Sequence, residues 1–154
     1  MNKIELMCIG DLKFKGLKEV EKNYIKKINY FTTFGVRNLK DIDIRDEEAK
    51  KKKEGRLMED ALDAKDWVIA LDQYGKKMDS IKFSQLLSDK IESHPYRIVF
   101  LIGGHAGIAK ELDNRIHQKI SFSDLTFAHD VFRVVFLEQL YRAFTISKGM
   151  TYHR

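Results

Sequence analysis

The chain has 154 residues, 44% hydrophobic and 33% charged, with 28 lysines and arginines against 23 acidic residues and a formal charge of +5. This length predicts one folded domain over residues 1–154, and the composition argues against a disordered chain. Cys8 is the only cysteine, which excludes an intramolecular disulfide and a cysteine-based zinc cluster. No apolar run is long enough to span a bilayer, and the first ten residues do not resemble a signal peptide, so we expect a cytoplasmic protein.

In the first part of the chain the apolar periodicity alternates between about 2 and about 3.6 residues, which is typical of alternating strands and helices. It predicts a strand over Lys3–Ile9, ended by Gly10, and a helix over Leu17–Phe31. A second, partly exposed strand is expected around three apolar residues, Leu39, Ile42 and Ile44. Asp46 is expected to cap the helix that follows.

Two continuous apolar runs in the second part predict strands that are buried on both faces, Trp67–Leu71 and Tyr96–Ile102. We expect the first to end in a turn over residues 72–75. A helix is predicted over Phe83–Ile91, with Ser80 as its cap.

The remaining segments are a short helix over Lys110–His117, apolar residues at 120–122 and 125–127, and a long helix over Val131–Ile146. The expected fold class is therefore α/β, a single domain with a mostly parallel sheet flanked by helices.

The first predicted helix carries a row of lysines opposite its apolar face. Lys18, Lys22 and Lys26 recur every four residues and share one side. Two interpretations stay open, a solvated helix face and a phosphate-binding face.

The last predicted helix is apolar almost all round, with a narrow polar side at Glu138, Gln139, Arg142 and Thr145. Such a helix must be buried on more than one side. We predict a homodimer built on this helix; the alternative is a helix that lies wholly inside the domain.

Ligands of open α/β sheets bind beyond the carboxyl ends of the strands. Three segments are expected there, residues 71–75, 103–107 and 123–128. The paired glycines Gly103 and Gly104 leave backbone N–H groups free for a ligand, although glycines also occur as simple turn residues. Their spacing and position in the chain do not match a Rossmann site, and no Walker A loop occurs.

The five histidines, His94, His105, His117, His129 and His153, form no metal-binding spacing, and we predict no metal site.

Several motifs in the last third of the chain occur together and in order: Leu101-Ile-Gly-Gly-His-Ala-Gly107, Leu125-Thr-Phe-Ala-His129, Arg133-Val-Val, Glu138-Gln-Leu-Tyr-Arg-Ala143 and the terminal Tyr152-His-Arg154. The set resembles the RlmH family, large-subunit rRNA pseudouridine N3-methyltransferases of the SPOUT superfamily. The resemblance extends over essentially the whole chain.

The resemblance implies a SPOUT-type α/β fold with a C-terminal trefoil knot, a homodimer, and S-adenosylmethionine as methyl donor. The implied cofactor-binding residues are Leu71, Gly104, Ser123, Asp124, Leu125, Thr126, Phe127 and Ala128. The implied substrate is a pseudouridine of 23S rRNA, methylated at N3 in the assembled ribosome.

Methylation at N3 requires loss of the imide proton. His129, Tyr152, His153 and Arg154 are the candidate catalytic residues, with the two histidines as candidate proton acceptors. Arg142, Tyr152 and Arg154 are the candidate substrate-binding residues. An alternative role for Arg142 is an ion pair with Glu138 on the same helix. We expect the tail to act in substrate binding and catalysis, either in its own subunit or in the partner's.

Two other functions are alternatives: a non-catalytic RNA-binding or ribosome-binding module of the same fold, and a nucleotide-binding oxidoreductase-like domain, which the glycine spacing disfavours.

Overall fold

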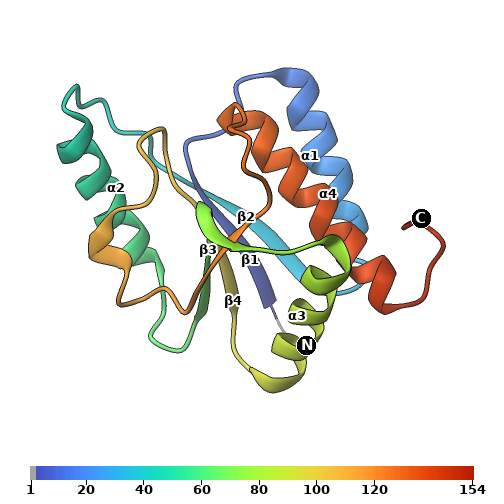
Figure 1. Ribbon diagram of the computed structural model, residues 1–154. Coiled ribbons are helices and arrows are strands. Elements are labelled where there is room, and N and C mark those ends of the chain that lie inside the picture. Colours follow the sequence, from blue (N-terminus) through green and yellow to red (C-terminus); the bar gives the residue numbers. More distant parts are fainter. Residues whose placement is uncertain (1–2) are drawn as a thin grey trace.

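The computed structural model describes residues 3–154 (Figure 1). Positions 1 and 2 of the expected domain lie outside the described residues, and the domain boundary stays a prediction. The elements in chain order are β1 (Lys3–Ile9), α1 (Lys15–Ile28), β2 (Thr33–Leu39), α2 (Glu47–Ala61), β3 (Trp67–Lys77), α3 (Ser80–Ser93), β4 (Ile98–Ile102), the 3-10 helix η1 (Lys110–Leu112), β5 (Gln118–Ser121) and α4 (His129–Ser147).

The strands form one five-stranded sheet in the order β2-β1-β4-β3-β5, and every pair of these strands is parallel. This confirms the predicted α/β class. β4 lies at the centre and all five of its residues are buried, which explains its continuous apolar run. The trefoil knot implied by the resemblance stays a prediction.

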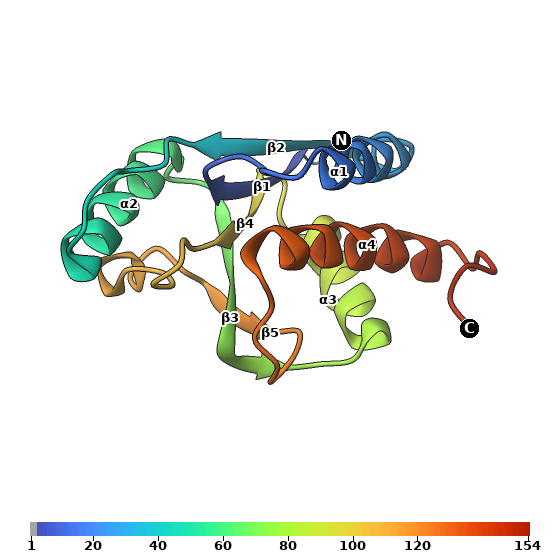
Figure 2. The ribbon, with the colours of Figure 1, turned by 90° about the horizontal axis from the view of Figure 1, so that it is seen from above.

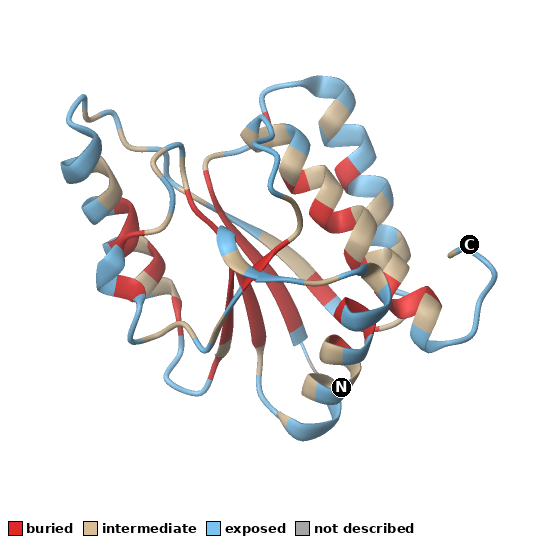
Figure 3. Cartoon of the chain, viewed as in Figure 1, coloured by how far each residue is buried: buried red, intermediate tan, exposed pale blue. Residues whose placement is uncertain are grey.

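The helices divide between the two faces of the sheet. α1, α3 and α4 cover one face, whereas α2 and η1 cover the other (Figures 1 and 2). Each face has its own apolar core: Phe100, Phe136 and Leu140 belong to the larger, and Met58 and Leu112 to the smaller. The buried residues in Figure 3 accordingly follow the strands and the sheet-facing sides of the helices.

β3 continues past the turn that was predicted to end it. The strand runs to Lys77, with a register shift against β5 between Leu71 and Lys76. Gly75 lies in this irregular stretch, where a Cβ would come within 2.7 Å of the backbone nitrogen of Ile120. The predicted turn over residues 72–75 is therefore wrong, because these residues form a bulge inside the strand.

Two other predicted elements differ from the structure. The second strand is Thr33–Leu39 and does not extend to Ile42 or Ile44, which follow it. β2 is an edge strand whose middle residues are only half-buried, so its sequence lacks the alternation of apolar and polar residues that predicts a strand. The short helix over Lys110–His117 is reduced to the single turn η1, after which the chain returns directly to β5.

Four predicted helices are present as α1, α2, α3 and α4, with small differences at their ends. Asp46 caps α2 as predicted, through a bond from the Ala49 amide. The cap of α3 is Asp79, whose carboxylate accepts from the Lys82 amide, so the expectation of Ser80 is wrong by one residue. The Ser80 hydroxyl donates instead to Gln139 of α4 at 2.6 Å.

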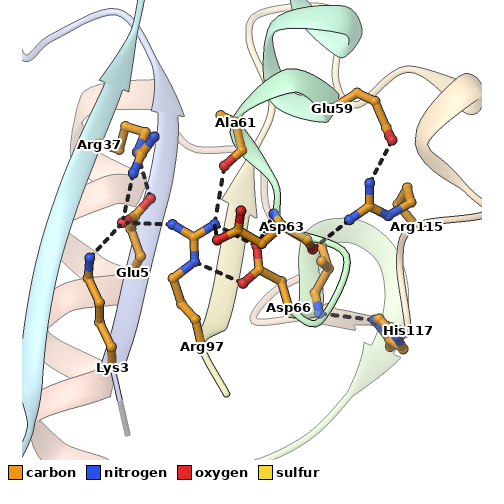
Figure 4. A network of polar contacts seen from close by, with 11 residues as sticks. Lys3, Glu5, Arg37, Glu59, Ala61, Asp63, Asp66, Arg97, Arg115 and His117 are labelled. Carbon is orange, nitrogen blue, oxygen red and sulfur yellow. Dashed lines mark hydrogen bonds and ion pairs between the residues drawn. The ribbon is translucent and has the colours of Figure 1, made fainter.

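A network of ion pairs and hydrogen bonds connects the amino-terminal ends of the strands (Figure 4). Arg97, just before β4, contacts Asp66 through Nε at 2.9 Å and Glu5 of β1 through Nη1 at 3.2 Å. Arg37 of the edge strand pairs with the same Glu5 at 2.8 Å. The network occupies one end of the sheet and leaves the carboxyl end for a ligand.

Candidate functional site

A cavity of about 410 Å³ opens at the carboxyl ends of β4 and β5 and beside the bulge of β3. Its walls come from the three segments that the sequence places there. The lining residues are Leu71–Tyr74, Ile102–Ile108, Ser121–Ser123, Leu125–Phe127, Lys51 and Phe132. A mixed wall of apolar side chains and backbone polar groups is typical of sites for small organic ligands.

The loop after β4 folds back on itself at its glycines. The Gly107 amide donates to the Gly104 carbonyl at 3.0 Å, and Gly107 has a φ of +87°. A Cβ on Gly103 would come within 2.6 Å of the Gly107 carbonyl oxygen. Only glycine allows the two sides of this loop to approach so closely, so its backbone forms part of the cavity wall.

The segment after β5 is held by short-range hydrogen bonds. The Ser123 hydroxyl accepts from the Leu125 amide at 2.9 Å, and Gln73 of β3 donates to the Asp124 carbonyl at 3.0 Å. The Asp124 carboxylate pairs with Lys77 of β3. This segment therefore faces the bulged part of β3 across the cavity.

The structure brings together most of the predicted cofactor-binding residues. Six of them line the cavity: Leu71, Gly104, Ser123, Leu125, Thr126 and Phe127. Asp124 and Ala128 are neighbours of the lining residues without being among them. Ala128 is the N-cap residue of α4.

His129 is the first residue of α4 and lies behind the glycine loop. Its Nε2 is 2.7 Å from the Gly103 carbonyl oxygen. A carbonyl oxygen can only accept, so this contact requires the tautomer, or the charged ring, with hydrogen on Nε2. The structure thus connects His129 to the backbone of the cavity wall.

The four other predicted functional residues, Arg142, Tyr152, His153 and Arg154, belong to the far end of α4 and the tail. The Tyr152 hydroxyl donates to Glu138 at 3.1 Å, and Arg142 contacts both Glu138 at 2.6 Å and His153 Nδ1 at 3.0 Å. The predicted ion pair between Arg142 and Glu138 is present.

Hydrogen bonds within this group affect its titration. The bond to Glu138 raises the pKa of Arg142 above its ordinary value. The pKa of Tyr152 is raised by burial and then by hydrogen bonds with Tyr24 and Glu138. Both side chains therefore keep their protons at neutral pH.

The tail is separate from the cavity of its own chain. Glu138, which Tyr152 contacts, follows His129 by nine residues, about 14 Å along a helix axis (138 − 129, at ~1.5 Å per residue). The carboxyl terminus lies beyond the far end of α4 in both views (Figures 1 and 2). The structure therefore does not bring Tyr152, His153 and Arg154 together with the loops of the same chain.

The sequence analysis did not identify Glu54 of α2, which lies under the glycine loop and is 3% exposed. Burial raises the pKa of Glu54. A glutamate within a lysine-rich helix gives no sequence signal of this kind, because the residues just before it, Lys52 and Lys53, are exposed lysines.

Within residues 3–154, no cluster of three or more His, Cys, Asp or Glu side chains could hold a metal ion. In the same part of the chain, no helix is long and apolar enough to cross a membrane.

Comparison with known proteins identifies the family. A family model described as "Predicted SPOUT methyltransferase" matches residues 2–153. A protein of Christiangramia forsetii named ribosomal RNA large subunit methyltransferase H is 37% identical over 153 residues, 97% of this chain and 98% of its own length. One of the same name from Mycoplasmopsis agalactiae is 37% identical over 155 residues and the full length of both chains.

These matches agree with the α/β fold of the structure. The chain belongs to the SPOUT methyltransferase family.

Proposed function

We propose that this protein transfers a methyl group from S-adenosylmethionine to N3 of a pseudouridine in 23S rRNA, acting on the ribosome in the cytoplasm. The observation that carries the proposal is the cavity between residues 71–74, 103–108 and 121–127 in a member of the SPOUT methyltransferase family. The names of the relatives, which refer to large-subunit rRNA, support the substrate class.

The cavity suits the proposed donor in size and in chemistry. Its volume of 410 Å³ lies within the range of about 300–1,000 Å³ usual for small-ligand sites. Leu71 and Phe127 offer apolar contacts, and the backbone of Gly104, Ser123 and residues 125–127 offers hydrogen-bonding groups. When bound, S-adenosylmethionine supplies an electrophilic methyl group on a sulfonium centre.

The acceptor nitrogen must lose its proton and lie in line with the methyl group. The residues we assign to this task are His129, Tyr152, His153 and Arg154, with Arg142 in substrate binding. Tyr152 offers an aromatic face for an unstacked base, and Arg142 and Arg154 offer positive charge for phosphate or for a developing anion.

We propose that the tail acts in the site of a partner subunit. The Tyr152 hydroxyl bonds to Glu138 of its own chain, well along α4 from the cavity of that chain. A homodimer with two-fold symmetry can place the tail of each subunit at the cavity of the other. The site of such an enzyme is complete only in the dimer.

Apolar side chains near the cavity end of the molecule support this homodimer. Leu125 is 71% exposed, Phe14 67% and Val131 42%. Phe14 and Val131 belong to neighbouring segments, because the Lys13 amide bonds to Asp130 at 3.0 Å. A second copy of the chain would cover this surface, which is costly to leave in water.

Calorimetry with S-adenosylmethionine and with NAD tests the proposed donor. We expect the first to bind in a 1:1 ratio to each chain and the second not to bind. Binding of NAD alone would overturn the methyltransferase assignment of this site.

A further inference from the structure

Glu54 is a buried carboxylate that the proposed chemistry does not use and that is not among the residues lining the cavity. It belongs to α2, on the opposite face of the sheet from α4. Its Oε2 atom has no hydrogen-bond partner in the described part of the chain. The nearby ammonium of Lys50 pairs with Asp41 at 3.6 Å. A buried oxygen without a hydrogen-bond partner lowers the stability of the folded state, which suggests that Glu54 has a role other than stabilisation.

The carboxyl group of Glu54 lies directly against the glycine loop. A Cβ added to Gly104 would come within 2.7 Å of Glu54 Oε1 and 2.9 Å of Cδ. The Gly104 amide lies close enough to this carboxylate to lower its pKa, which partly offsets the effect of burial. The next residue, Gly55, packs equally closely, because a Cβ there would come within 2.7 Å of Ala109 Cβ. α2 thus packs directly against the glycine loop and the residues that follow it.

The same peptide group is held from the other side by His129. The Gly103 carbonyl, which accepts from His129 Nε2 at 2.7 Å, and the Gly104 amide belong to one peptide unit. In a planar trans peptide these two groups point in opposite directions. His129 of α4 therefore bonds to one end of this peptide group, and the Glu54 carboxyl of α2 lies against the residue at the other end.

We propose that Glu54 is a positioning residue which, together with His129, fixes the orientation of the Gly103–Gly104 peptide and so the ligand-binding shape of the glycine loop. Gly104 lines the cavity, so a rotation of this peptide would change which backbone groups face the ligand. The inference rests on the proposed function for the identity of the ligand. It assigns Glu54 an effect on donor affinity and none on the chemical step.

Three variants test this role by calorimetry with S-adenosylmethionine: Glu54→Leu, Glu54→Gln and, as a matched control on the same helix, Glu59→Leu. Glu59 pairs with Arg115 at 2.6 Å. Leucine removes the acceptor, and we expect affinity to fall about tenfold; glutamine retains an acceptor oxygen, and affinity should stay within about threefold of wild type. The control should bind as wild type does.

Steady-state kinetics separate positioning from chemistry. For Glu54→Leu we expect the KM of the donor to rise about tenfold and kcat to change by no more than about twofold. The positioning role would be overturned if Glu54→Leu bound the donor as tightly as wild type does. It would also be overturned if Glu54→Gln and Glu54→Leu lost the same amount of donor affinity. A fall in kcat with an unchanged KM would likewise overturn it.

A measurement without any donor tests the contact itself. The Gly104 amide resonance in an ¹⁵N–¹H spectrum should move in Glu54→Leu and in His129→Phe, and stay in place in Glu59→Leu. Since both residues hold one peptide group, the double variant should lose less donor affinity than the product of the two single losses. An unmoved resonance or fully multiplicative losses would overturn the joint role. Failure of the wild type to bind the donor would instead refute the proposed function.

Discussion

Arg133 of α4 and Glu21 of α1 form a buried ion pair in which Nε donates to Oε2 at 2.6 Å and Nη2 donates to Oε1 at 3.1 Å. Arg133 is 1% exposed, and its Nη1 also donates to the Gly10 carbonyl at 3.2 Å. The pair connects the first turns of α4 to α1 and to the end of β1. It therefore fixes the helix that carries His129 against the rest of the domain.

Replacing Arg133 with methionine should lower the free energy of unfolding by about 3–5 kcal/mol, because Glu21 would be left charged and unpaired in the interior. Urea denaturation followed by circular dichroism measures the change. The double variant Arg133→Met with Glu21→Leu should recover part of the loss.

An exposed ion pair serves as the control for this prediction. Lys119 and Asp113 lie 2.8 Å apart at the surface, and Lys119→Met should change the free energy of unfolding by less than about 1 kcal/mol. A loss in Arg133→Met as small as the control's would contradict a stabilising role for the buried pair.

Burial raises the pKa of the Cys8 thiol to about 12. The thiol of the unfolded chain loses its proton near pH 8.5. Between these values the folded chain holds one more proton than the unfolded chain, so stability must fall as pH rises, by up to about 1.4 kcal/mol per pH unit from this group. Below about pH 8 the group has no effect on the pH dependence.

Comparison with Cys8→Ala isolates this contribution, because the other titrating groups are shared. As the pH rises from about 8 to 11, the unfolding free energy measured in urea should fall more steeply for wild type than for Cys8→Ala. Parallel curves would show that the Cys8 thiol titrates alike in the two states.

Much of the fold was predictable because its strongest signals are local. The continuous apolar runs of β3 and β4 and the 3.6-residue pattern of α4 require no knowledge of their neighbours. β2 was misplaced because an edge strand need not alternate. The bulge at residues 72–75 resembles a turn in sequence, and only its pairing with β5 shows that the strand continues.

The sequence predicts the loops of the candidate site, but neither the contact of Glu54 with the glycine loop nor the distance of the tail from the cavity. Leu71 ends the buried apolar run of β3, and Gly104 and the 123–128 segment follow β4 and β5, so their common position follows from a parallel sheet. Glu54 comes from a helix on the other face, and its contact with Gly104 depends on how α2 packs. The separation of Tyr152 from the cavity depends on the direction and length of α4, which a motif does not reveal.

Mixed dimers test whether the tail acts in the partner's site. One chain would lack residues 152–154, and the other would carry Gly104→Trp to block the cavity. Each chain alone should be inactive. When the two chains are mixed and pair at random, half of the dimers contain one of each. Each mixed dimer has one complete site of two, so the mixture should recover about a quarter of wild-type activity. No recovery in dimers confirmed as mixed would show that the tail acts within its own chain.

The lysine row of α1 gives a test of the phosphate-binding interpretation. Lys18→Gln, Lys22→Gln and Lys26→Gln together should weaken binding to ribosomes and reduce the slope of log affinity against log salt by about 2 to 3. The matched control is the triple variant Lys52→Gln, Lys53→Gln and Arg56→Gln, which removes the same charge from exposed positions of α2. Equal effects of the two sets would favour the solvated-face interpretation.

The central claim is methyl transfer to N3 of a pseudouridine in 23S rRNA. The most direct measurement incubates ribosomes that lack the modification with this protein and isotope-labelled S-adenosylmethionine, then maps the methylated fragment by mass spectrometry. The account predicts one labelled methyl group on a pseudouridine of 23S rRNA, and none when residues 152–154 are removed. Ribosomes that remain unlabelled, although the wild-type protein binds both them and the donor, would contradict it.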